Sequence, residues 1–421
     1  MRITRHNATV VAMVLSSVLA VGACSQGSAT KPDTTASGSA VTTVTYMNFS
    51  ANGGHEKDLD AIRAGFEKDN PNIKVKIETV PYDGYFTKLQ TAVAGGTATD
   101  AFELNYENFV TYSSNGSLAD LTGVDSAKYK PSLLGAFASG GKQFGLPESF
   151  SNVVLFYNKD LFAAAKVAEP TASWTWADED AAAKKLTDKA KGIWGDYQPI
   201  SFFEFYKTLA QAGGQFLSAD KMSSTFNSDA GKKAAAFLVD KSGTTMPTEA
   251  DGAGTPDFDS KLFKSGKLAM WHTGIWMFSG MADAPFNWDI AVEPGDTQKA
   301  SAMFTNGAVV SAASTHKDAA QKWITYLTSS DLMVQTRLTT SWELPPIGDE
   351  SKLSAYLTAG KPANRHAVFD SLNATVLPPV IAREAEMQDA INKELTAAAA
   401  HRKDVATALA DAQAAVDKLL K

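Results

Sequence analysis

Residues 262–276 read Leu-Phe-Lys-Ser-Gly-Lys-Leu-Ala-Met-Trp-His-Thr-Gly-Ile-Trp. The first residues have the pattern of an amphipathic helical turn, and the apolar run Leu268 to Met270 predicts a short buried strand. Gly274 then lies between Trp271 and Trp276, which places flexible backbone beside two large indoles at the end of that strand. Each tryptophan can be a core residue or a stacking surface for a flat ligand, and the stretch alone leaves both readings open.

Length and composition set the class of the protein. The chain has 421 residues, 44% of them hydrophobic, which is enough for a large core and for two lobes. Its formal net charge is -7 and it has no basic run, so nucleic acid is not expected as a partner. The six histidines show no metal-ligand spacing, and no Walker loop, zincin motif or nucleophile elbow is present. We therefore expect no catalytic residues, no metal and no cofactor.

The N-terminus predicts secretion. Arg2 and Arg5 precede the apolar run Val10 to Ala20, which is too short to span a bilayer comfortably. Small residues before Cys24, the only cysteine, resemble the lipobox of bacterial lipoproteins. That resemblance implies a signal peptide at residues 1–23 and a lipidated Cys24 that anchors the protein on the extracytoplasmic face of the cell membrane. A plain signal peptide with an incidental cysteine is the alternative. Residues 24–40 are rich in Ser, Thr, Gly and Ala and predict a flexible tether.

Folding is expected to begin near Val41. Three short segments predict strands, Val41 to Tyr46, Ile73 to Thr79 and Asp100 to Leu104, with helical patterns between them. This order of elements is typical of a βαβ unit at the start of an α/β fold. Polar residues follow the first strand from Asn48 to Asn52, and Tyr106 and Glu107 follow the third. Loops at the carboxyl ends of strands are where α/β sheets bind ligands.

The rest of the chain continues the α/β pattern and then becomes helical. Further strands are predicted at Val153–Tyr157, Trp288–Val292 and Gly307–Ala313. From Leu353 to Lys421 the pattern is helical, and its last helix has an apolar seam capped by Asp404. The seam consists of Val405, Leu409, Ala412, Val416 and Leu419. It covers only about two heptads, so we expect it to pack on a lobe and not in a coiled coil.

Several motifs, each weak alone, resemble the extracellular sugar-binding proteins of ABC importers, the maltose-binding-protein-like family 1, in its lipoprotein form. Their order and spacing cover nearly all of the chain from residue 41. They are Phe66-Glu67-Lys68-Asp69-Asn70-Pro71, Ile73-Lys74-Val75, Thr99-Asp100-Ala101-Phe102, Gly116-Ser117-Leu118-Ala119-Asp120-Leu121, Gly145-Leu146-Pro147-Glu148, Leu155-Phe156-Tyr157-Asn158-Lys159-Asp160-Leu161, Gly213-Gly214, and Phe263, Gly266, Ala269, Met270, Gly274 and Trp276 in the opening stretch.

The resemblance implies an α/β fold of two lobes, the periplasmic-binding-protein fold, with a ligand cleft between them. Hinge crossings are expected near Pro147–Glu148, Val292–Pro294 and Pro345–Pro346. They divide the chain into lobe 1 (residues 41–147 plus 293–345) and lobe 2 (residues 148–292 plus 346–421). Such a protein is expected to be a monomer that captures a mono- or oligosaccharide and delivers it to the transmembrane subunits of an ABC importer.

A sugar site pairs flat aromatic surfaces with hydrogen-bonding side chains, because a pyranose has one apolar C–H face and a rim of hydroxyls. Trp276 is the preferred stacking candidate, from its residue type and from the family motif together. The resemblance also implies an acidic ligand residue at Glu107. The other ligand candidates are Trp342, Glu148, Trp271, Asn52, Ser50, Asn48, Tyr106, Phe203, Tyr206 and Asn306. For each one, a core, hinge or solvated role is the alternative.

One departure from the family pattern and two rival functions remain to be considered. Tyr46 and Phe49 stand where the family has a tryptophan, so the identity of the sugar cannot be copied from a relative. A secreted glycoside hydrolase is the rival from another class, because stacking tryptophans with Glu107 and Glu148 could also describe a glycosidase. A binding protein for a non-sugar solute, such as an osmolyte or a peptide, is the third reading.

Overall fold

The fold is built on a central β-sheet. The computed structural model describes residues 41–255, 257–340 and 342–421. Residues 41–421 form one compact unit. Eight strands make a mixed sheet in the order β2-β1-β3-β9-β6-β7, with β8 paired to β6 and β10 to β9, and β4 and β5 form a separate pair. The strands are β1 (Thr42–Asn48), β2 (Ile73–Thr79), β3 (Ala101–Asn105), β4 (Ala138–Ser139), β5 (Lys142–Gln143), β6 (Gly145–Asn158), β7 (Met270–Gly274), β8 (Trp288–Ala291), β9 (Ser301–Val310) and β10 (Thr375–Val376).

Helices pack around this sheet. Among them, α11 contacts β1, β3, β6 and β9, and α7 packs against α8. The α-helices are α1 (Glu56–Asp69), α2 (Tyr82–Ala94), α3 (Tyr106–Ser114), α4 (Pro131–Ala136), α5 (Lys159–Ala165), α6 (Trp176–Leu186), α7 (Phe202–Gln211), α8 (Asp229–Val239), α9 (Phe258–Lys264), α10 (Phe278–Met281), α11 (Lys317–Ser329), α12 (Asp331–Thr340), α13 (Ser354–Leu357), α14 (His366–Asp370), α15 (Glu384–Ala399) and α16 (Val405–Leu419). A short 3-10 helix, η4 (Ile275–Met277), follows β7. The α/β class that the sequence predicted is confirmed.

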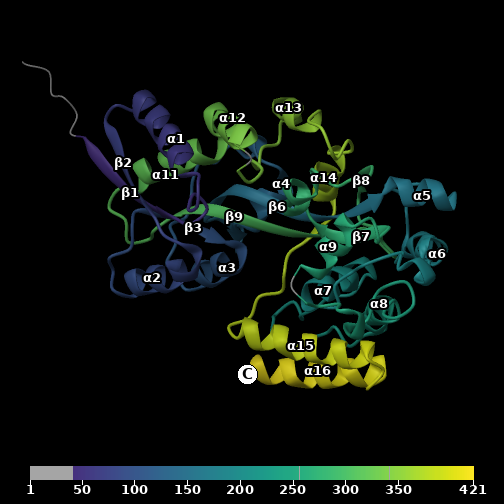
Figure 1. The fold of residues 1–421 in the computed structure, drawn as a ribbon. Coiled ribbons are helices and arrows are strands. Elements are labelled where there is room, and N and C mark those ends of the chain that lie inside the picture. Colours follow the sequence, from purple (N-terminus) through teal and green to yellow (C-terminus); the bar gives the residue numbers. More distant parts are fainter. Residues whose placement is uncertain (1–40, 256, 341) are drawn as a thin grey trace, which may run out of the picture. The chain divides into compact units, whose positions relative to one another are not determined.

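Strands β6 and β9 run side by side through the middle of the sheet (Figure 1). The first part of β6 pairs with β9, with an irregularity between Pro147 and Ser149, and its last part pairs with β7 and β8. The irregularity coincides with the first predicted crossing. The division into two lobes stays a prediction.

Strand β9 lies earlier in the chain than the sequence predicted. We expected a strand over Gly307–Ala313, but it spans Ser301–Val310. The expectation was wrong because the first half of the strand contains polar residues, which do not fit the pattern of a buried strand. Their hydroxyls are buried within the sheet: Ser301 donates to the Val153 carbonyl at 2.6 Å, and Thr305 donates to the Ser149 carbonyl at 2.7 Å. These bonds satisfy polar groups that would otherwise oppose burial.

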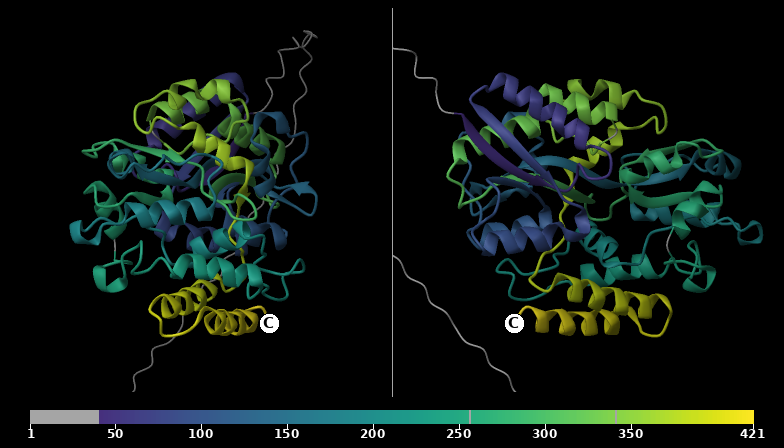
Figure 2. Two further views of the ribbon diagram at one scale, coloured as in Figure 1. Left: turned by 90° about the vertical axis from the view of Figure 1, so that its right-hand side faces the viewer. Right: turned by 60° about the vertical axis from the view of Figure 1, so that its left-hand side comes forward.

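The C-terminal helices α15 and α16 pack against each other and against α8 (Figure 2). The predicted seam of α16 is buried at Leu409, Ala412 and Val416, where it joins a core cluster with α7 and α8. The Asp404 side chain accepts a hydrogen bond from the Thr407 amide at 2.9 Å, which caps the helix as expected. The predicted packing on the folded domain is therefore confirmed.

The expected signal peptide (residues 1–23), the lipidated Cys24 and the tether (residues 24–40) lie outside the described residues. Within residues 41–421, none of the described helices combines the length and apolar character needed to cross a bilayer.

Candidate ligand-binding cavities

Two cavities meet at the side chain of Phe304, which lines both. The smaller has a volume of about 380 Å³, and we call it the polar cavity. Its lining consists of Phe49, Ser50, Tyr82, Asn105, Glu107, Phe304, Thr305, Asn306 and Glu343. The larger, about 670 Å³, we call the aromatic cavity. It is lined by Ser151, Val153, Pro199, Ser201, Phe203, Glu204, Asp257, Asp259, Ser260, Trp271, His272, Thr273, Trp276, Met277, Ala302 and Phe304. Both volumes are in the range of small-molecule sites.

Hydrogen-bonding groups from the ends of strands build the polar cavity. Glu343 accepts a hydrogen bond from the Ser149 hydroxyl and lies 3.3 Å from the Asn306 amide nitrogen. Behind this wall, Glu103 is fully buried and accepts the backbone amides of Phe49 at 2.9 Å and Ser50 at 3.0 Å. These bonds fix the loop after β1, so the backbone of Ser50 is held rigidly at the cavity.

Glu107 lies in the first turn of α3, whose N-cap is Asn105. The Asn105 side chain accepts a hydrogen bond from the Asn108 amide at 3.2 Å, which explains why the helix begins at the end of β3. Burial raises the pKa of the Glu107 carboxyl. Burial, followed by the charge of Glu107, raises the pKa of Glu384 at the start of α15 to about 7. The carboxyl of Glu107 on the wall of the polar cavity and that of Glu384, which the charge of Glu107 affects, therefore hold their protons more tightly than usual.

Three of the aromatic side chains that line the aromatic cavity are at least partly exposed, and they come from different elements. Trp276, on η4, is 52% exposed, and Phe203, on α7, is 37% exposed. The Phe304 ring on β9 contacts both of them, with ring centroids 5.7 Å from Trp276 and 5.9 Å from Phe203. Large exposed aromatic side chains inside a cavity are available to a ligand, whereas buried ones serve packing.

Trp271, five residues earlier, is only 1% exposed and packs between Phe156 and Phe263. Its indole nitrogen donates to Asp259 at 3.1 Å. Trp271 therefore belongs to the wall of the aromatic cavity and to the core behind it.

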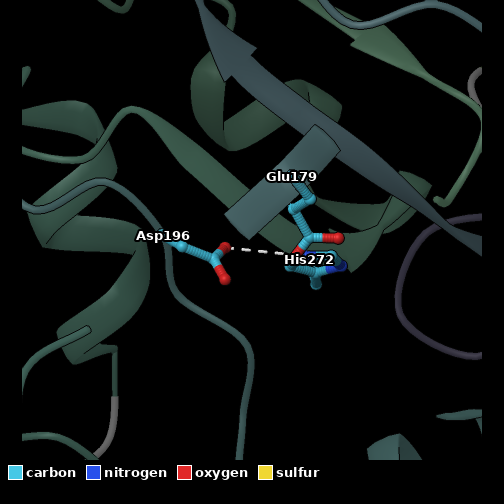
Figure 3. Close-up of side chains that lie close together, drawn as sticks. All are labelled: Glu179, Asp196 and His272. Carbon is cyan, nitrogen blue, oxygen red and sulfur yellow. Dashed lines mark hydrogen bonds and ion pairs between the residues drawn. The ribbon is translucent and has the colours of Figure 1, made fainter. Parts of the chain in front are cut away.

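A buried ionic network lies behind the aromatic cavity. Figure 3 shows its central residues, with the His272 ring next to Glu179 and Asp196. The His272 Nε2 atom lies 3.1 Å from Glu179 and 3.3 Å from Asp196, and its Nδ1 atom lies 3.0 Å from Glu293. Burial alone would lower the pKa of His272, but the three carboxylates raise it well above its usual value. Both ring nitrogens face carboxylate oxygens, which accept hydrogen bonds, so this environment favours the protonated ring.

Two buried lysines complete the network. Lys241 Nζ lies 2.5 Å from Glu179 and 2.6 Å from Asp196. Lys207 Nζ lies 2.6 Å from Glu204 and 2.5 Å from Glu293, so the network reaches the cavity wall through Glu204.

The trio Glu179, Asp196 and His272 has ligand atoms within 4.8 Å of one another, close enough for a metal ion. However, Lys241 forms ion pairs with both carboxylates and supplies the positive charge that a metal would provide. The donor set therefore fits a structural ion network better than a metal site.

Six of the sequence candidates line the two cavities. Ser50, Glu107 and Asn306 line the polar cavity, and Phe203, Trp271 and Trp276 line the aromatic cavity.

The other six candidates line neither cavity, and four of them are buried. Asn48 is buried and accepts the Ala51 amide at 3.3 Å, closing the loop after β1. Glu148 is buried and paired with Arg337 at 2.8 Å. Tyr206 is also buried, Tyr106 is half-buried at the start of α3, and Asn52 is exposed on the loop.

Trp342 is the sixth of these candidates. Its indole is 4% exposed and lies between the His55 ring, stacked at 5.1 Å, and the Arg337 guanidinium, 4.2 Å away. Its nitrogen donates to the Ser50 carbonyl at 3.1 Å. Trp342 therefore has no free face for a ligand. It supports the loop that contains Ser50, which lines the polar cavity.

Sequence reasoning missed Phe304, Glu343 and Tyr82. Phe304 and Asn306 are both partly exposed on β9 while Thr305 between them is buried, so an alternating pattern was available. It was overlooked because the predicted strand began at Gly307. Nothing local distinguishes Glu343 from other acids, since only the packing of α12 and the following segment brings it to the cavity.

Comparisons with known proteins identify the family. The family model described as bacterial extracellular solute-binding protein matches residues 53–333. The fold resembles that of an ABC substrate-binding protein from Listeria monocytogenes, solved in complex with cycloalternan. That structure is 43% identical and matches with a TM-score of 0.75 over 90% of this chain and 98% of that one.

Two further relatives are more distant. A cyclic alpha-maltosyl-1,6-maltose binding protein from Arthrobacter globiformis is 24% identical, with a TM-score of 0.76 over 90% of this chain and 99% of that one. A maltooligosaccharide ABC transporter solute-binding lipoprotein of Streptococcus pneumoniae is 24% identical over 99% of this chain and 97% of the relative. These matches confirm the family that the sequence motifs indicated, which is one of binding proteins and not of enzymes. The chain belongs to the bacterial extracellular solute-binding proteins.

Proposed function

We propose that this protein is the receptor of an ABC importer for an oligosaccharide, which it binds across the polar and aromatic cavities. The observation that carries the proposal is the half-exposed Trp276 in a cavity that adjoins, through Phe304, a second cavity rich in hydrogen-bonding groups. This arrangement matches the two surfaces of a sugar, because an indole stacks on the apolar C–H face and carboxylates or amides bind the hydroxyl rim.

The shared Phe304 favours an oligosaccharide over a single sugar ring. Each cavity alone is large enough for a small ligand, and a ligand that contacts both must extend past the Phe304 ring. Relatives named for binding maltooligosaccharides and a structure solved with cycloalternan support this choice of ligand class.

The charges of the lining favour a ligand without negative charge. Glu107 and Glu343 line the polar cavity, and Glu204, Asp257 and Asp259 line the aromatic one. Among the described lining residues there is no lysine or arginine. An anionic sugar would therefore meet like charges, because the lining residue His272 is already paired with the buried carboxylates of Glu179, Asp196 and Glu293.

The test is a thermal-shift screen followed by calorimetry on the mature protein. The panel holds monosaccharides, linear and cyclic oligosaccharides, an oligosaccharide oxidised to a carboxylate, and a small quaternary amine. We expect neutral oligosaccharides to raise the melting temperature most, because a ligand that binds only the folded state stabilises it. Preference for the monosaccharide or for the oxidised sugar would contradict the proposal. Preference for the amine would favour a cationic solute, which the acidic lining also suits.

A glycoside hydrolase would need two carboxyl groups flanking one bond. Of the two candidates for that role, Glu107 lines the polar cavity, whereas Glu148 is buried and paired with Arg337. The same calorimetric samples, analysed by chromatography, are expected to return the oligosaccharide unchanged. If shorter sugars were released, the result would support a glycoside hydrolase instead.

Delivery to the importer is expected to follow closure of two lobes around the ligand, from a membrane anchor on Cys24. A relative described as a solute-binding lipoprotein, aligned over 99% of this chain, supports the anchor. The test is membrane fractionation with mass spectrometry of the N-terminus. We expect the native protein in the membrane fraction with acyl chains on Cys24, and Cys24→Ser in the soluble fraction. An unmodified Cys24 would rule out lipid anchoring.

A further inference from the structure

Backbone conformation does not explain why a glycine stands at residue 274, close to Trp276. Gly274 ends β7 with φ of -89° and ψ of 162°, which is extended backbone open to any residue. The glycine is therefore not needed for its torsion angles, and some other constraint must explain it.

That constraint is space. A Cβ atom built on Gly274 would lie 1.9 Å from Cζ3 of the Trp276 indole and 2.1 Å from its Cε3 and Cη2 atoms. All three are atoms of the six-membered ring, so the indole lies directly against the α-carbon of Gly274. No side chain, not even the methyl group of alanine, can occupy that position while the ring stays where it is.

The α-carbon of Gly274 is fixed more firmly than the indole. Gly274 is paired with Val153 in the β6–β7 ladder, inside a sheet. Trp276 lies beyond the strand on a 3-10 turn, with half of its surface exposed and the edge of Phe304 as its aromatic neighbour. A methyl group at residue 274 would therefore displace the ring and leave the strand in place.

We propose that Gly274 is the positioning residue of the Trp276 stacking surface, acting solely by leaving room for the indole. The proposal rests on the proposed function, because it treats Trp276 as a surface for the ligand. Preorganisation of this kind affects affinity, since a ring held in its binding position need not be reordered when the ligand arrives.

The test is a double-mutant cycle of Gly274→Ala and Trp276→Ala, with calorimetry against the best oligosaccharide of the screen. Gly274→Ala alone is expected to weaken binding about 10-fold. In the Trp276→Ala background the same substitution is expected to change affinity less than about 2-fold, because no ring remains to be displaced. Near-ultraviolet circular dichroism of Gly274→Ala should show an altered tryptophan signal, with a melting temperature within about 3 °C of the parent.

Gly280→Ala is the matched control. Gly280 is exposed on α10, and the nearest atom to an added Cβ would be the Met277 terminal methyl at 3.9 Å. It should bind the sugar as the parent does.

The outcomes separate this proposal from the proposed function. If Trp276→Ala leaves affinity unchanged, the stacking role itself is wrong. If Trp276→Ala weakens binding but Gly274→Ala does not, or if Gly274→Ala weakens it equally in both backgrounds, only the positioning role is overturned.

Discussion

The polar and aromatic cavities share Phe304 yet are stabilised in different ways. The polar cavity is built from strand-end loops and from the segment after α12, and its groups are tied by hydrogen bonds such as those of Glu343. The aromatic cavity is built on the sheet and on α7, and a buried network of charges lies behind its wall. The difference teaches that the wall under the stacking surface is held by buried ion pairs, whereas the polar cavity is held by hydrogen bonds to loops and strand ends.

The largest expected effect concerns the ionic network. Lys241→Met should lower the free energy of unfolding by about 3–5 kcal/mol, because it leaves the two buried carboxylates of Glu179 and Asp196 with His272 as their remaining cationic neighbour. Urea unfolding measures the change. Lys184→Met is the control, since Lys184 pairs with Asp180 on the surface and should matter by about 1 kcal/mol or less. Equal effects of the two substitutions would show that burial does not distinguish these pairs.

Removal of the stacking surface is expected to have the next largest effect. Trp276→Ala should weaken oligosaccharide binding about 30-fold while leaving the fold intact, because an exposed indole adds little to the core. Calorimetry measures the change. Met222→Ala removes a side chain that is also exposed but lines neither cavity, and it should bind as the parent does. If Trp276→Ala bound the oligosaccharide with unchanged affinity, the aromatic cavity would not be the one that supplies a stacking surface.

A smaller effect is expected in the polar cavity. Glu107→Gln keeps one acceptor and the shape of the side chain but loses the charge, and should weaken binding of a neutral oligosaccharide about 5-fold. Glu249→Gln, at an exposed position outside both cavities, is the control. If the Glu107 variant instead bound more tightly, the carboxylate would oppose the ligand, and the polar cavity would select a different chemistry.

The smallest effect is a pH dependence of stability near the polar cavity. The folded-state pKa of Glu384 is raised to about 7 from 4.5, so this group binds its proton more tightly when folded. Its contribution to stability is fully present below about pH 4.5 and is lost as the pH rises to about 7. Glu384→Gln should flatten that part of the decline in melting temperature between pH 4.5 and 7.

Glu386→Gln provides the control on the same helix. Its carboxyl has a lowered pKa because Arg383 donates hydrogen bonds to it, so its contribution to the pH dependence has the opposite sign. The parent decline should persist in this variant. If Glu384→Gln declines as steeply as the parent, the raised pKa of Glu384 is not its source.

Local patterns were sufficient for most elements of the fold. The βαβ start, the strand Ile73–Thr79 and the seam of α16 follow from periodicity and from signals at element ends, which act over a few residues. The start of β9 could not be predicted in this way, since Ser301 and Thr305 are buried only because carbonyls of β6 accept their hydroxyls.

The sequence by itself indicated the family and an aromatic surface for a ligand, because several short motifs, each weak alone, follow one another in the family's order and spacing. The tertiary structure alone decided which aromatic residues are free. Trp271, Trp276 and Trp342 are chemically identical, yet one is packed in the core, one is exposed on a cavity and one lies between His55 and Arg337. The physical reason is that exposure depends on neighbours from distant parts of the chain, whereas residue type and spacing are local properties.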